Sequence, residues 1–245
     1  MLATDPTVGR PVDLTAGLTA ARVFRERVVP CGIAPLRKLE TIVEQKLAAV
    51  RALEHCGTDR FRDEFEEVIR GVAAARPHRT SMVGESSPGE VRAILREARE
   101  GILGVAALPQ VADRLAGAPR EVRLDVASEL LHGSVPDRIA LVARWVWNPA
   151  RGTGALTEFG IPSDGSYAAA QTRLGEIRLE LAALGFPCDS FAGVDVVMAL
   201  AYAARLQQAT DARLRSGGLE ALLPGAFPLA TMILGVRRRV IDANR

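Results

Sequence analysis

Apolar residues return every three to four positions along most of this chain, the spacing that places them on one face of an α-helix. In the clearest example the apolar face runs from Leu36 to Leu53, and the opposite face carries Arg, Lys, Glu and Gln. Residues 167–184 show the same period. No stretch longer than four residues alternates apolar and polar side chains as a half-buried strand would. The sequence therefore predicts an all-α fold.

The helical period predicts one domain of about nine to ten helices over residues 1–245. Residues 138–147 are apolar almost all round, so we expect a central helix there, covered on every side. Residues 76–89 are rich in Pro, Gly and Ser and are expected to form a loop. This loop is a candidate sub-boundary between an N-terminal helical hairpin, residues 1–75, and a helical core, residues 90–245.

Short motifs mark the expected ends of helices. Ser87–Glu90 and Ser134–Asp137 both have the spacing of a capping box, in which a serine side chain accepts from the first free N–H groups. Gly133 is expected to end one helix directly before the second box. Ser190 is expected to cap the most apolar long helix, and the Gly- and Pro-rich residues 148–166 are expected to form a long loop.

The composition is that of an ordinary globular protein, since 48% of the 245 residues are apolar, 24% are charged and the net charge is +2. These proportions exclude a disordered chain and a polytopic membrane protein, and the charge indicates neither a nucleic-acid nor a membrane partner. Three cysteines without paired spacing, and a start without a cationic leader and apolar run, favour the cytoplasm. Because Lys38 and Lys46 are the only lysines, we expect mostly Arg–Glu and Arg–Asp ion pairs.

The motifs of several common enzyme classes are missing from the sequence. There is no P-loop signature, and residues 84–89 only approach the GxSxG spacing of a serine hydrolase. Glu129 and His132 have the Glu-x-x-His spacing of di-iron bundles, but neither His55 nor His78 has a Glu three residues before it. The sequence predicts no metal site and no cofactor, and His132 is expected to stabilise a helix C-terminus.

The loop after residue 147 is the best sequence candidate for ligand binding. Two glycines flank a threonine beside an arginine, so backbone N–H groups there are expected to face an anion. The candidate ligand-binding residues are Arg144, Trp147, Arg151, Gly152, Thr153 and Gly154. The alternative is that the glycines only turn the chain at the end of a helix.

Asp195 interrupts the apolar stretch 191–204 of the long helix. Its helical neighbours Phe191, Met198 and Tyr202 belong to an apolar stripe. A carboxylate in this position is either satisfied by free N–H groups near the helix start, or buried with a raised pKa and a partner. Asp195 is therefore a candidate catalytic residue under the second reading.

Residues 186–191, Phe-Pro-Cys-Asp-Ser-Phe, resemble the segment that carries the catalytic aspartate of helix–hairpin–helix DNA glycosylases. Residues 161–167 are loosely similar to the hairpin of that family. The resemblance implies that Asp189 supports base excision and that hairpin amides hold a DNA phosphate. The hairpin here keeps one of the two family glycines, no Lys stands at the lyase position, and the spacing from hairpin to aspartate is longer. Helix capping is the alternative role for Asp189.

The primary expectation is a helical binding protein that takes a small anionic ligand or a partner protein. It would use the loop after Trp147 and the neighbouring apolar helices. The alternative is a glycosylase-like enzyme that uses Asp189, with nucleic acid as its partner. A third alternative is a non-catalytic scaffold or oligomeric interaction protein. The apolar helices also predict a homo-oligomer, and no membrane partner is expected.

Overall fold

The computed structural model describes residues 20–160, 164–186, 188–216 and 225–236. Every helix or strand element within these ranges is helical, so the all-α prediction is confirmed. The α-helices are α2 (Ile33–Ala52), α3 (Thr58–Arg70), α4 (Arg79–Glu85), α5 (Pro88–Arg99), α6 (Leu108–Asp113), α7 (Arg120–Ser134), α8 (Tyr167–Ala183), α9 (Phe191–Ser216) and α10 (Ala226–Ile233). Short π or 3-10 turns are η1 (Phe24–Val28), η2 (Val29–Cys31), η3 (Ala73–His78), η4 (Val105–Ala107) and η5 (Ala155–Glu158).

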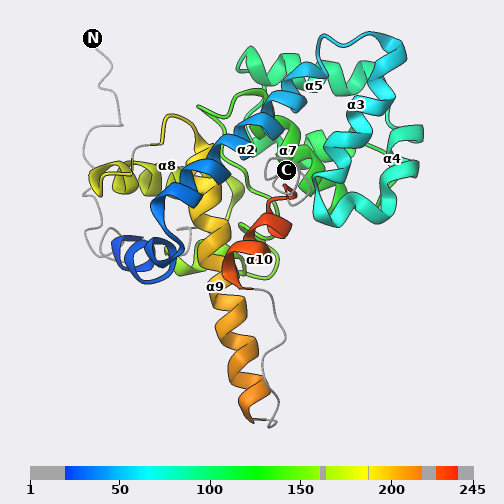
Figure 1. Cartoon of the computed structure of the whole chain (residues 1–245). Coiled ribbons are helices and arrows are strands. Elements are labelled where there is room, and N and C mark those ends of the chain that lie inside the picture. Colours follow the sequence, from blue (N-terminus) through cyan, green and yellow to red (C-terminus); the bar gives the residue numbers. More distant parts are fainter. Residues whose placement is uncertain (1–19, 161–163, 187, 217–224, 237–245) are drawn as a thin grey trace, which may run out of the picture.

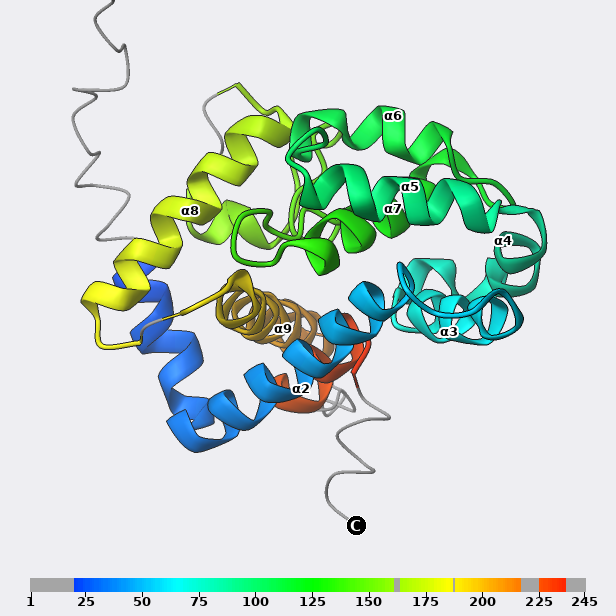
Figure 2. The same cartoon turned by 90° about the horizontal axis from the view of Figure 1, so that it is seen from above.

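Two helices, α7 and α9, organise the packing. α7 contacts α2, α5 and α6, whereas α9 contacts α2, α8 and α10. α2 therefore contacts both groups of helices and runs across them, as Figure 2 shows. The buried apolar side chains of the described residues form one cluster from Ala20 to Val236.

α2 and α7 cross at a glycine. A Cβ on Gly133 would lie 2.5 Å from Cβ of Val50, so only glycine allows the two helices to approach this closely. α7 ends at Ser134, one residue past the end predicted at Gly133. The Ser134 hydroxyl donates to the carbonyl of Leu130, 3.0 Å away, within the same helix, so the predicted second capping box does not form.

Residues 139–147, the central segment, are not helical, and the predicted central helix is wrong. Residues 139–143 are all buried, as expected, but side chains of neighbouring helices accept hydrogen bonds from three backbone N–H groups of the central segment. The pairs are Ala140 N with Gln171 Oε1 at 2.8 Å, Val142 N with Ser128 Oγ at 2.7 Å and Arg144 N with Asp125 Oδ1 at 2.8 Å. Full burial suits any backbone whose polar groups find partners, so apolarity alone does not identify a helix.

The expected loop over residues 76–89 is also largely helical. Pro77 lies inside the 3-10 turn η3, and α4 follows it directly. Met82 of α4 is fully buried. A Cβ on Gly117, which has a φ of +77°, would lie 2.4 Å from the carbonyl of Ser81, so α4 packs directly on backbone. Tertiary contact therefore stabilises helix in a stretch whose composition is typical of a loop.

Two of the predicted caps are confirmed. Ser87 accepts a hydrogen bond from the backbone N of Glu90 at 3.5 Å, at the start of α5. Ser190 accepts from the backbone N of Ala192 at 3.1 Å, at the start of α9. These bonds satisfy N–H groups that have no partner within the first turn of a helix.

α9 is the longest described helix, and Figure 1 shows its C-terminal half projecting from the body of the molecule. No described helix is long and apolar enough to span a membrane. α10 returns along α9, and at its end Gly235, with a φ of +72°, contacts Gly71 so closely that a Cβ would lie 1.7 Å from the Gly71 oxygen. Arg237–Arg239, which follow α10 in the sequence, lie outside the described residues.

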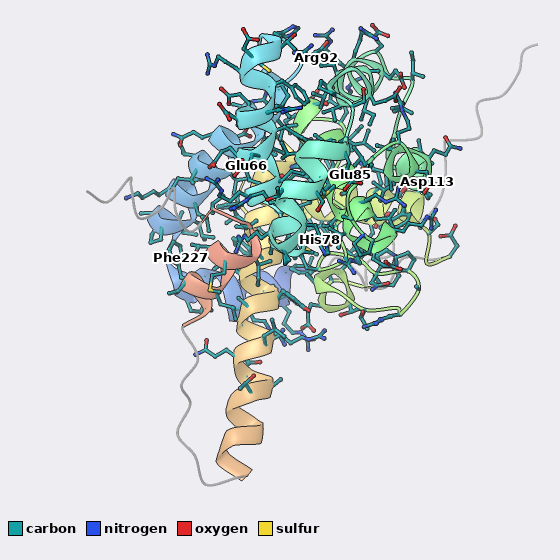
Figure 3. All side chains as sticks on the ribbon, turned by 90° about the vertical axis from the view of Figure 1, so that its right-hand side faces the viewer. Glu66, His78, Glu85, Arg92, Asp113 and Phe227 are labelled. Carbon is teal, nitrogen blue, oxygen red and sulfur yellow. The ribbon has the colours of Figure 1, made fainter. Side chains whose placement is uncertain are left out.

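Apart from a contact between His55 and Glu54, the surface ion pairs of the described residues are formed by arginine, as the composition predicts. Figure 3 shows the side of the molecule with α3, α4 and α10, on which Glu66, Glu85 and Phe227 lie. Glu66 pairs with Arg70 at 2.7 Å and with Arg79 at 3.3 Å. Exposed pairs of this kind contribute at most about 1 kcal/mol each, so the fold depends mainly on its buried contacts.

Candidate functional site

A pocket of about 270 Å³ lies where α2, α7, α10, η3 and the central segment meet. It is called the charged pocket below, because four ionisable side chains line it. They are Lys46 of α2, Asp125 and Glu129 of α7, and Arg144 of the central segment. Leu141, Ala143, Trp145 and Ile233 form its apolar wall, and Gly71–Ala74 line one side. A concave site with an apolar wall and a few convergent polar groups is typical of ligand binding.

Lys46 reaches the charged pocket from the buried face of α2. Its Nζ lies 2.8 Å from Oε1 of Glu129 and donates to the carbonyl of Leu234 at 3.0 Å. Lys46 is 7% exposed and Glu129 is 4% exposed, so this ion pair is almost fully removed from water. A Cβ on Gly71 would lie 3.0 Å from Cε of Lys46, so glycine leaves room for the lysine stem. Removing either charge would leave the other buried without a partner.

Asp125 and Arg144 form the second ion pair of the charged pocket. Nε and Nη2 of Arg144 donate to Oδ2 of Asp125 at 3.0 and 2.8 Å, and the backbone N of Arg144 donates to Oδ1 at 2.8 Å. These hydrogen bonds outweigh the effect of partial burial and raise the pKa of the Arg144 guanidinium. The aspartate therefore fixes both the backbone and the side chain of Arg144 at the pocket wall.

Some hydrogen-bonding capacity in the charged pocket is unused. Lys46 has three N–H donors. One is donated to the carbonyl of Leu234, whereas the contact with Oε1 of Glu129 is an ion pair without hydrogen-bond geometry. Nη1 of Arg144 has no acceptor, and Oε2 of Glu129 has no donor, among the same residues. The pocket thus offers two cationic donors and one anionic acceptor to a bound molecule.

A second buried pair, His132 of α7 and Asp195 of α9, lies beside the charged pocket. Nε2 of His132 is 2.8 Å from Oδ2 of Asp195, and Nδ1 is 2.6 Å from the carbonyl oxygen of Ile139. His132 is 0% exposed and Asp195 is 4% exposed. The pair therefore joins α7, α9 and the central segment without contact with solvent.

The geometry requires the pair to hold a proton. A carbonyl oxygen only accepts, so Nδ1 of His132 carries a hydrogen. A hydrogen is then needed between Nε2 and Asp195 as well, either on the imidazole or on the carboxyl group. Burial opposes the charged form of His132, but Asp195 and the Ile139 carbonyl outweigh it and raise its pKa above the ordinary 6.5. Burial also raises the pKa of Asp195, against the influence of His132 and Lys46.

The structure brings two of the sequence candidates into this region. Arg144 lines the charged pocket, and Asp195 is buried with a partner, the second of the two alternatives considered for it. Trp147 is 1% exposed and its Nε1 donates to the carbonyl of Gly165 at 2.8 Å. Trp147 therefore packs in the core, and its neighbour Trp145 lines the pocket instead.

The Arg151–Gly154 loop forms a tight turn. The backbone N of Asn148 donates to the carbonyl of Thr153 at 2.7 Å, and Arg151, Gly152 and Thr153 are exposed. Gly154 is buried, and a Cβ there would lie 2.3 Å from the carbonyl oxygen of Val146. None of these loop residues lines the charged pocket, so anion binding by the loop stays a prediction.

Asp189 is exposed and lies directly before the Ser190 cap of α9. A second, shallower hollow nearby is lined by residues that include Asp137, Arg178 and Cys188, but not Asp189. The guanidinium of Arg178 donates to the carbonyls of Cys188 and Asp137, so it is occupied in fastening the chain. Part of the stretch that resembles a glycosylase hairpin, residues 161–163, lies outside the described residues, as does Pro187.

Lys46 and Asp125 were not among the site residues predicted from the sequence. A signal for both was present in the helical spacing. Lys46 falls three residues after Val43 and four before Val50, on the buried stripe of α2. On α7, Asp125, Ser128, Glu129 and His132 recur at intervals of three and four, which forms a polar stripe on a buried helix.

No protein-family model, curated protein or solved structure matches this chain. Within the described residues, no group of three or more His, Cys, Asp or Glu side chains is arranged to hold a metal ion. The function is therefore argued from the charged pocket itself.

Proposed function

We propose that the protein binds a small polar molecule without net charge in the charged pocket. The observation that carries this proposal is the convergence of Lys46, Asp125, Glu129 and Arg144 on one hollow. Buried charge is costly, and stability alone is often served as well or better by apolar residues of similar volume. Four charges directed to a single concave surface therefore favour a binding role.

The balance of charge distinguishes this ligand from the anion expected at the Arg151–Gly154 loop. Two cations and two carboxylates line the pocket, and they already form two pairs. A ligand with a single charge would leave that charge uncompensated in a site of low dielectric constant. A molecule without net charge avoids this cost.

The size of the pocket limits the ligand further. At about 270 Å³, it lies just below the range of roughly 300–1,000 Å³ that is usual for drug-sized ligands. We therefore propose a compact metabolite. The free thiols of Cys56 and Cys188 support a reducing compartment, so the cytoplasm is proposed as the place where it is bound.

The two tryptophans allow a direct test of this proposal. We suggest titrating the 15N-labelled protein with a panel of amino acids, polyols, small amides and small carboxylates, and following the two indole N–H signals by NMR. A ligand in the charged pocket is expected to shift the signal of Trp145 and leave that of the buried Trp147 unchanged. If no compound of the panel shifts Trp145, or if both signals shift together, the proposal is wrong.

A variant that fills the pocket provides the matched control. Ala74 lines the charged pocket and is half-buried, so Ala74→Phe is expected to block binding while leaving all four charges in place. Ala107 is equally half-buried but lies outside the pocket, and Ala107→Phe should bind as the wild type does. Equal binding by both variants would place the ligand elsewhere.

A further inference from the structure

We infer that the ligand of the charged pocket is a zwitterion with an ammonium and a carboxylate on the same or adjacent carbon atoms, as in an α-amino acid. This inference rests on the proposed function and specifies its ligand. Three observations support it: the order of the charges along α7, the hydrogen-bonding groups that remain unused, and the apolar wall beside them.

The charges of the pocket alternate over a short distance. Asp125 and Glu129 are four residues apart on α7, so they lie one above the other, with Cβ atoms about 5–6 Å apart. Each has its own cation, Arg144 for Asp125 and Lys46 for Glu129. Positive and negative groups therefore stand side by side on one wall, and a molecule with two opposite charges close together matches this order.

The unused hydrogen-bonding groups determine how the ligand is oriented in the pocket. Both oxygens of Asp125 are already occupied by Arg144, whereas Oε2 of Glu129 has no donor among the described residues. The ligand ammonium is therefore placed at Glu129. A remaining N–H of Lys46 and Nη1 of Arg144 then donate charge-assisted hydrogen bonds to the ligand carboxylate.

The apolar wall determines the rest of the molecule. Leu141, Ala143 and Trp145 line the pocket next to the charged groups. With little more than 270 Å³ available, only a small side chain fits after the charged ends are seated. The best match is an amino acid with a short aliphatic side chain, whose burial against this wall adds a hydrophobic contribution.

The test compares four probes with the same branched aliphatic group. L-valine carries both charges, isobutylamine only the ammonium, isovalerate only the carboxylate, and isovaleramide neither. We expect L-valine to shift the Trp145 indole signal with an affinity at least tenfold higher than that of each of the other three, while Trp147 stays unchanged. If isovaleramide binds as well as valine, the zwitterion inference is wrong and the proposed function stands. If isobutylamine or isovalerate binds as well as valine, both the inference and the proposed function are wrong. If none of the four shifts Trp145 but a polyol or another small amide of the panel does, the zwitterion inference is wrong and the proposed function stands.

Two variants test the assigned direction. Arg144→Lys keeps the charge but loses the fork, and is expected to weaken valine and isovalerate alike, by about tenfold, with isobutylamine unchanged. Glu129→Gln alone would leave Lys46 without its counter-ion, so a double variant, Lys46→Met with Glu129→Leu, removes the pair together and is expected to remain folded. The ratio of the affinity for valine to the affinity for isovalerate should fall to near one in this double variant. A preference retained in this folded double variant would overturn the assignment of the ammonium to Glu129.

Discussion

His132 and Asp195 store a proton in the middle of the molecule, and this has a consequence for stability. The pKa of His132 is raised above 6.5 in the folded state, so the folded protein keeps a proton that the unfolded chain releases near that pH. The stabilisation is therefore complete below about pH 6.5. It is lost as the pH rises through the folded-state pKa.

Asp195→Asn tests this linkage. The amide of the variant can still donate to Nε2 of His132, but it no longer stabilises the protonated imidazole. The free energy of unfolding of the wild type is expected to fall with rising pH above about 6.5, with a slope of at most about 1.4 kcal/mol per pH unit for one proton. The variant should lack this component, as measured by urea unfolding between pH 6 and 9. Parallel pH curves for the two proteins would contradict the shared proton.

Gly133 makes a second prediction for a single residue. Gly133→Ala is expected to destabilise the protein by about 1–3 kcal/mol, because the added methyl group would overlap Val50 of α2. Gly175→Ala in α8 is the matched control, since a Cβ there has no neighbour within 4 Å. That variant should gain roughly 0.5–1 kcal/mol from its higher helix propensity. Thermal unfolding of both variants measures the difference, which would be absent if the helices could separate freely.

Single residues also show which parts of the candidate site could be predicted from the sequence. Asp195 was identified because a charged group in an apolar stripe is visible in the sequence, and Arg144 because it lies close in the sequence to the candidate anion-binding loop. Lys46 was not, since one lysine on a buried stripe has meaning only when Glu129 of another helix is known to face it. The pairing of charges between distant elements is a property of the packing, and a single sequence does not record it.

Among the elements, the central segment depends on side chains for its backbone hydrogen bonds. Ser128→Ala removes the acceptor of the Val142 N–H, and this buried donor is then expected to cost about 1–3 kcal/mol. Hydrogen exchange at Val142 should become faster in the variant. Ser134→Ala is the control, because its hydroxyl only returns to Leu130 within α7. Equal effects of the two substitutions would show that α7 does not hold the segment.

The elements that were predicted correctly are those with a two-sided pattern. α2, α8 and α9 have an apolar and a polar side or a clear cap, and their observed limits agree with the expected ones to within a few residues. The central segment has no polar side, so the spacing of its apolar residues could not distinguish a buried helix from a buried extended chain. η3 and α4 were not predicted as helical because their Gly, Pro and Ser content is typical of a loop. Burial of Met82 stabilises the helix there.

For the whole molecule, the single core predicts cooperative unfolding. α2 contacts α7 and α9 alike, and α7 contacts η3, so packing crosses the candidate sub-boundary at residues 76–89. Calorimetry of the full chain is expected to show one transition whose van't Hoff and calorimetric enthalpies agree. Two resolved transitions would instead establish residues 1–75 and 90–245 as separate folding units.

The projecting half of α9 affects how the molecule moves in solution. A helix of 26 residues is about 39 Å long, at a rise of 1.5 Å per residue. Because part of this length extends beyond the body, the protein should not tumble as a sphere (Figure 1). Nuclear relaxation would then depend on orientation, since amide vectors along the axis of α9 report slower reorientation than those across it. The protein is thus expected to have an anisotropic diffusion tensor with its long axis near α9.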